Sequence, residues 1–81
     1  MAEDSVLRTV LAAVREVAPG AEVNEDTQLI ALRVIDSLSL LNLVALLEKE
    51  FSITVRDSEI LPAHFESPVA IRAFLRSKGH S

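Results

Sequence analysis

Ser37 and the acid before it, Asp36, are the residues of this 81-residue chain whose types and position could do chemistry. They directly precede a leucine-rich stretch with the pattern of a helix, so we expect both to lie at its N-terminus, where their side-chain oxygens can cap it. Unpaired backbone N–H groups and the helix dipole favour an anion at that end. A phosphodiester on the Ser37 hydroxyl would therefore be stabilised. On these residues alone, a role limited to capping is the simpler interpretation.

Ser37 lacks the local pattern of a serine-hydrolase nucleophile. Such a serine needs a base that takes its proton and a site that stabilises an oxyanion. Residues 35–39 do not form the G-x-S-x-G elbow, and His64 is the one candidate base. A lone histidine in a short chain is more often a solvated surface residue. We therefore expect that the chain is not an enzyme.

Composition limits the remaining classes. The chain has no cysteine and two histidines, which excludes disulfides and thiolate metal sites and leaves too few ligands for a histidine-rich metal site. Its longest apolar runs are far shorter than the roughly 20 residues that span a bilayer. Residues 1–17 alternate charged and aliphatic residues, unlike a secretion signal, so we expect a cytoplasmic protein.

The negative charge is concentrated in the middle of the chain. Residues 36–66 contain six acids and two bases, whereas the other residues balance, and the net charge is −4. This distribution disfavours nucleic acid as a partner and favours basic protein surfaces.

The first half of the chain predicts one helix and a long loop. Aliphatic residues at helical spacing begin after Asp4 or Ser5, and Pro19 and Gly20 end the helix. Residues 18–35 are irregular and rich in turn formers. Four of them are too apolar for a free linker, so we expect the loop to be pinned to the core through Leu29, Ile30, Leu32 and Ile35.

The second half predicts two longer helices and one short helix. The helix that starts at Asp36 or Ser37 runs to about Phe51, and a short helical turn at residues 57–61 is ended by Pro62. A last helix opens with a serine cap and a first-turn proline and ends at Gly79. With few aromatic residues and 49% apolar residues, the fold is expected to be all-α, with a core that includes Val10, Leu43, Leu47, Ile71 and Phe74.

The helix at residues 37–51 has more apolar surface than one core contact requires. At 100° per residue, Leu43, Val44, Leu47 and Phe51 fall within about 60° of the direction of Leu40 and form the core stripe. A second apolar stripe lies on the side where a surface helix is polar, and Leu46 adds to the surplus. A domain of this size can hardly bury a helix on all sides, so we expect an exposed patch formed by Leu38, Leu41 and Ala45.

Several motifs occur in the order and spacing of a known family. They are Asp-Ser-Leu at residues 36–38, Leu-Glu-Lys-Glu-Phe at 47–51, Ser-Ile-Thr-Val at 52–55 and Phe-Glu-Ser at 65–67. Asp-Ser-Leu alone is a weak signal, but together these motifs make essentially the whole chain resemble the acyl carrier protein family. The resemblance implies a single carrier domain at residues 1–81, folded as a four-helix bundle of acyl-carrier type with a long loop between its first two helices.

The resemblance also implies a cofactor and partners. A phosphopantetheinyl transferase would move 4'-phosphopantetheine from coenzyme A onto Ser37, and Asp36 would assist by helping that enzyme to position Mg²⁺ and the hydroxyl. The terminal thiol would then hold an acyl or aminoacyl group as a thioester. Leu38, Leu41 and Ala45 would contact the transferase, the loading enzyme and later biosynthetic enzymes. The carrier would be a monomer that holds no metal and binds neither nucleic acid nor membrane.

Three positions depart from the fatty-acid carriers of the family, whose second helix is strongly acidic. Asn42 and Lys49 occupy places where Glu would be expected, and Ser39 replaces a common acid. These changes favour other partners than those of bulk fatty-acid synthesis. Residues 62–67 resemble discrete carriers of aminoacyl, peptidyl or specialised polyketide pathways, so we expect polyketide or nonribosomal peptide-type biosynthesis.

Two alternatives stay open. The chain could be a fatty-acid carrier, which must shelter a long acyl chain between its helices. It could also be an unmodified helical interaction module that uses the same apolar patch to dock a partner.

Overall fold

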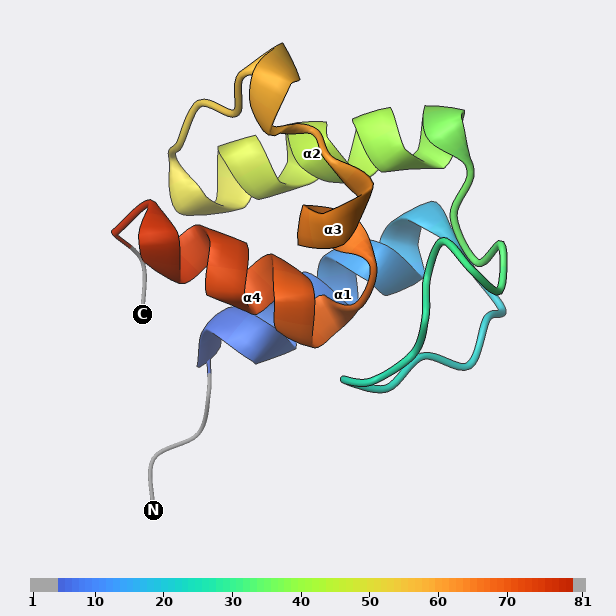
Figure 1. The fold of residues 1–81 in the computed structure, drawn as a ribbon. Coiled ribbons are helices and arrows are strands. Elements are labelled where there is room, and N and C mark those ends of the chain that lie inside the picture. The colour runs from blue at the N-terminus through green and yellow to red at the C-terminus, as the bar shows by residue number, and fades with distance from the viewer. Residues whose placement is uncertain (1–4, 80–81) are drawn as a thin grey trace.

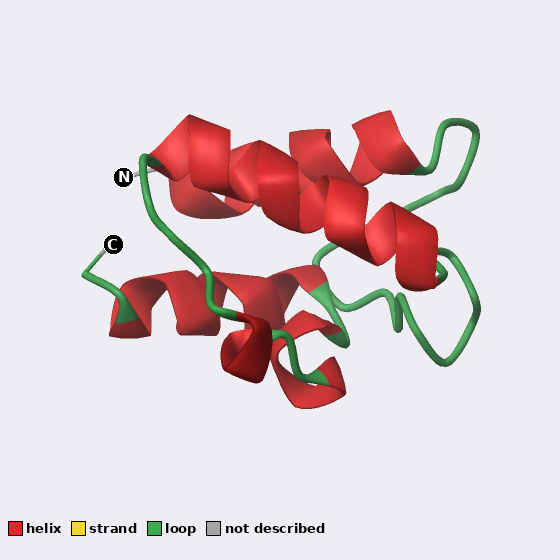
Figure 2. Ribbon diagram, turned by 90° about the horizontal axis from the view of Figure 1, so that it is seen from above, coloured by secondary structure: helices red, strands yellow, loops and turns green. Residues whose placement is uncertain are grey.

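The computed structural model describes residues 5–79, which form helices and loops and no strand (Figures 1 and 2). Three longer helices and one short one confirm the predicted all-α bundle. Asp4, one of the two predicted starts of the first helix, lies outside the described residues. The elements in chain order are α1 (Ser5–Val17), α2 (Ser37–Phe51), a 3₁₀ turn (Asp57–Glu59), α3 (Pro62–Phe65) and α4 (Pro68–Ser77).

The core lies where α1, α2 and α4 meet. α1 packs against both α2 and α4, and α3 packs against α4. On α1, Val6, Val10 and Val14 recur every four residues, which places them on one side of the helix, and all three are buried. The five residues expected in the core are buried as predicted: Val10, Leu43, Leu47, Ile71 and Phe74.

The loop between α1 and α2 is held against the α3–α4 junction by backbone hydrogen bonds. The Leu29 N–H donates to the Glu66 carbonyl at 2.8 Å, and the Val69 N–H donates to the Glu25 carbonyl at 3.1 Å. The side chains of Leu29 and Ile35 are 0% and 3% exposed. The prediction that this loop is pinned to the core is confirmed for these two residues and for Ile30, which is partly buried and packs against the core.

Leu32 is the exception in this loop, because 67% of its surface is exposed. The Ile35 N–H donates to the Leu29 carbonyl at 3.1 Å, so the two buried residues close the base of a turn. Within that turn Arg33 has a left-handed backbone, with φ 56°. Ile30 and Val34 still pack partly against the core, but Leu32 in the middle of the turn does not, so the expectation that Leu32 packs inside is wrong.

The short helix lies further along the chain than predicted. Residues 57–61 contain only the 3₁₀ turn, and α3 begins at Pro62 instead of ending there. Proline suits the first position of a helix, because its φ is already helical and no intrahelical acceptor is needed for its missing N–H. Phe65 ends α3 and is completely buried, which anchors this helix to the core.

The last helix begins and ends as predicted. The Ser67 Oγ accepts a hydrogen bond from the Ala70 N–H at 3.2 Å, and Pro68 occupies the first helical turn. Gly79 follows with φ 98°, a conformation that glycine adopts without strain.

Two leucines of the loop provide a matched test of its anchoring. Leu29→Ala should lower the free energy of unfolding by about 2–5 kcal/mol, because it leaves a cavity in the core. Leu32→Ala removes the same atoms from an exposed site and should change it by less than about 0.5 kcal/mol. Urea denaturation followed by circular dichroism measures both, and equal losses would contradict the described loop.

Candidate functional site

Asp36 caps the N-terminus of α2. Its Oδ1 accepts a hydrogen bond from the Ser39 N–H at 2.8 Å, and the Leu40 N–H donates to its carbonyl at 2.8 Å. Hydrogen bonds from the Ser39 N–H, and then from the Ser39 hydroxyl, hold the pKa of the Asp36 carboxyl below its ordinary value. The group is therefore an exposed carboxylate at neutral pH. The capping role predicted for Asp36 is confirmed.

Ser37 is the first residue of α2 and not a cap. Only the residue before the helix has the extended backbone that turns a side-chain oxygen back onto the N–H groups, and Asp36 occupies that position. The Ser37 side chain is exposed. No residue in the described part of the chain hydrogen-bonds its Oγ. The hydroxyl is accordingly free to react with a group brought by another protein.

His64, the one candidate base in the sequence, is part of α3 and packs on the ring of Phe74. Their ring centroids are 4.7 Å apart, and the imidazole is half-buried. The expectation of a solvated surface histidine is therefore wrong. No hydrogen bond between His64 and Ser37 is present in residues 5–79, so the structure does not bring the two together as a base and a nucleophile.

The apolar patch predicted next to Ser37 is exposed. Leu38 and Leu41 are 68% and 55% exposed, and Ala45 is exposed one turn further along α2. Leu43, Val44 and Leu47 on the opposite side are buried, as the helical wheel predicted. Leu46, which the sequence counted as surplus, instead packs against the core and faces α1.

Two exposed leucines were not identified from the sequence. Leu32 lies in the turn before α2, and Leu61, 47% exposed, comes just before α3. Neither belongs to a periodic segment, so no helical pattern could assign it a side. The only sequence signal is an apolar residue next to turn-forming or proline residues.

Two of the acids that make the middle of the chain negative serve the fold itself. The Glu48 Oε2 accepts a hydrogen bond from the Val55 N–H at 2.8 Å. Glu59 forms an ion pair with the Nζ of Lys78 at 3.0 Å. A hydrogen bond from the Arg56 N–H, and then the pairing with Lys78, hold the Glu59 pKa below its ordinary value. These carboxylates are less available to basic partner proteins than the sequence suggested.

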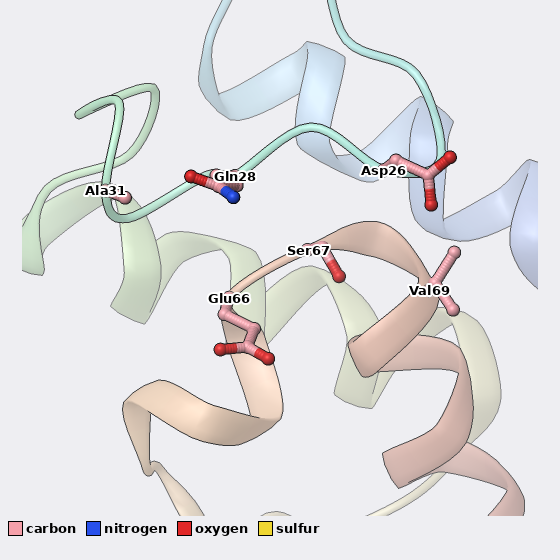
Figure 3. A pocket seen from close by; sticks show the side chains of 6 residues that line it. All are labelled: Asp26, Gln28, Ala31, Glu66, Ser67 and Val69. Carbon is pink, nitrogen blue, oxygen red and sulfur yellow. The ribbon is translucent and has the colours of Figure 1, made fainter.

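A hollow of about 420 Å³ lies between the long loop and the α3–α4 junction, beside the backbone hydrogen bonds that join them. Figure 3 shows the loop side chains of Asp26 and Gln28 on one side and those of the junction on the other. Most of its lining is polar, and none of it belongs to the core cluster. The lining residues are Asp26, Gln28, Ala31, Glu66, Ser67 and Val69.

Residues 5–79 contain no cluster of His, Cys, Asp or Glu that could hold a metal ion. In the same residues no helix combines the length and the apolar character that crossing a membrane requires.

Comparison with protein families relates this geometry to a known function. A family model described as "phosphopantetheine attachment site" matches residues 5–75, which include all four helices up to the last turn of α4. Neither the curated proteins nor the solved structures gave a significant match. The structure fits the family's cofactor, because it presents an exposed, unbonded serine hydroxyl at the N-terminus of a 15-residue helix. The chain therefore belongs to the phosphopantetheine attachment site family, that of the acyl carrier proteins, in which 4'-phosphopantetheine is attached covalently to a serine.

Proposed function

We propose that Ser37 is the serine that carries the 4'-phosphopantetheine arm. The observation that carries this proposal is the exposed Ser37 hydroxyl on the first residue of α2. Ser37 also lies within residues 5–75, which the family model matches. A phosphodiester there would lie at the positive end of the helix dipole. An apolar patch begins at the next residue, Leu38, so an enzyme that handles the arm finds a surface to bind beside it.

The attachment is a phosphoryl-group transfer that another enzyme must catalyse. The Ser37 Oγ attacks the phosphorus of coenzyme A that bears pantetheine, and a P–O–P bond breaks. Adenosine 3',5'-bisphosphate leaves, and the hydroxyl proton passes to a base of the transferase. Asp36 is ionised and exposed next to this hydroxyl, which supports a role in helping the transferase to position Mg²⁺ and the serine.

Once modified, the chain is a non-catalytic carrier that holds an acyl or aminoacyl group as a thioester on the arm. Leu38, Leu41 and Ala45 then form the surface that partner enzymes bind: the transferase, a loading enzyme and later biosynthetic enzymes. This assignment is supported by their exposure on one side of α2. The described residues form one carrier domain, since a single core joins all its helices.

For the cargo, we propose a short polar group of the aminoacyl or specialised polyketide type. The hollow that Ala31 lines, in the loop before α2, is bordered mainly by polar side chains and by none of the core residues. A long acyl chain gains most from apolar shelter, whereas a short polar cargo can stay in solvent. Asn42 and Lys49 on the exposed side of α2 also differ from the acidic surface of fatty-acid carriers.

Intact-mass spectrometry tests the attachment directly. Incubation with coenzyme A, Mg²⁺ and a broad-specificity phosphopantetheinyl transferase should add one phosphopantetheine mass to the wild type. Ser37→Ala should gain none, because it lacks the attacking oxygen. Ser39→Ala, two residues further along α2, is the matched control and should still gain the full mass. No gain by the wild type with several transferases would instead favour an unmodified interaction module.

Asp36→Asn tests the electrostatic state of the cap. The amide oxygen can still accept the Ser39 hydrogen bond, but the charge is lost. The pKa of the Asp36 carboxyl is lower in the folded than in the unfolded state. The carboxylate therefore stabilises the fold at pH values above the ordinary carboxyl pKa of about 3.9. This stabilisation disappears as the pH falls through the lower folded-state pKa. The wild-type Tm should exceed that of the variant near pH 7, and the difference should shrink toward about pH 3. A difference that does not vary with pH would contradict this account.

A further inference from the structure

The surface around Ser37 is less acidic than the charge of residues 36–66 suggests. Asp36 is used as the cap of α2, and Glu48 and Glu59 make the internal contacts described above. Glu50 faces α1, where it borders a hollow together with Thr9 and other α1 residues. Glu48, Glu50 and Glu59 thus contact other parts of the fold, whereas Asp36 stays exposed next to Ser37.

After its cap, α2 has one fully exposed acid, Glu50, and this residue lies beside α1 and not on the patch. The exposed residues of α2 on the patch side are Leu38, Leu41, Asn42, Ala45 and Lys49, of which only the last is charged. Two exposed carboxylates, Asp26 of the loop and Glu66 at the α3–α4 junction, border the polar hollow that Ala31 also lines (Figure 3). Beside the patch, a basic enzyme surface would therefore meet the Asp36 carboxylate of the cap but no acid among these five residues of α2.

The turn before α2 carries an exposed apolar side chain and an exposed cation. Leu32 is 67% exposed, nearly as much as Leu38. Arg33 follows it, is exposed, and has no side-chain partner in the described part of the chain. The Arg33 N–H donates to the Ile30 carbonyl at 3.1 Å, so Leu32 and Arg33 lie in one tight turn. The turn therefore presents a leucine and an unpaired guanidinium four to five residues before Ser37.

We infer that the enzyme that modifies Ser37 docks on an apolar surface formed by Leu32, Leu38 and Leu41, with an acidic group of that enzyme facing Arg33. This inference rests on the proposed attachment at Ser37, since an enzyme that reaches this hydroxyl must contact the residues around it. Burial of three exposed leucines drives the association, and one cation at the edge selects a partner of opposite charge. A strongly basic docking surface would instead be repelled by Arg33 and Lys49.

Steady-state kinetics with a broad-specificity phosphopantetheinyl transferase as the probe tests this surface. Leu32→Ser and Arg33→Glu should each raise the KM for the carrier about tenfold and leave kcat within about twofold, because they remove binding that is equal in the ground and transition states. Arg56→Glu is the matched control. It makes the same charge change at an exposed residue beyond the other end of α2, and it should leave KM within about twofold.

Two further measurements separate docking from folding. Leu32→Gln and Arg33→Asn are second variants of lower structural risk, since asparagine tolerates a left-handed backbone. All variants should unfold within a few degrees of the wild type. A lower KM for Arg33→Glu would show that the partner surface is basic. An unchanged KM for the Leu32 variants or for the Arg33 variants would show that this residue lies outside the interface. Each of these results would overturn the inference. A wild type that takes up no phosphopantetheine would refute the attachment at Ser37 itself.

Discussion

The hydrogen bond from the Ser39 N–H to the Asp36 carboxylate is the interaction on which the site depends. It ends the preceding loop, starts α2 at Ser37, and so determines that Ser37 is the first helical residue with its side chain in solvent. The same contact keeps Asp36 ionised beside the hydroxyl. A later start of the helix would rotate Leu38 and Leu41 about its axis and change which apolar side chains lie next to the serine.

The long loop keeps this helix terminus in place. Leu29 and Ile35 are buried, and their backbone groups bond to each other, while Leu29 also bonds to the junction between α3 and α4. The entry to α2 is therefore tied to the α3–α4 junction, although few residues of the loop have regular structure. Between the two anchors, Leu32 and Arg33 are exposed, four to five residues before the candidate attachment site. One loop thus both fixes the helix entry and supplies part of the surface around it.

Local signals explain what could be predicted from the sequence. Two helix starts can be recognised from adjacent residues alone: Asp36 before a leucine-rich stretch, and Ser67 before Pro68. The periodicity of α2 distinguishes the buried Leu43 and Leu47 from the exposed Leu41. Contacts between distant residues explain what could not. The exposure of Leu32 follows from the turn closed between Ile35 and Leu29, and Leu29 is itself held by Glu66, which is distant in the sequence. The use of Glu48 as an acceptor for Val55 depends on how the chain leaves α2. Pro62 was ambiguous for a different reason, because proline both ends helices and begins them.

The account assigns the two tasks of a carrier to different parts of one short segment. The hydroxyl proposed to accept the arm is at the first position of α2, and the exposed apolar side chains proposed as the partner surface follow within two helical turns. The measurement that tests this most directly is tandem mass spectrometry of peptides from the wild-type protein after modification with coenzyme A and a transferase. The account predicts that the phosphopantetheine group is found on Ser37 alone. A group located on Ser39, or on any other residue, would contradict it.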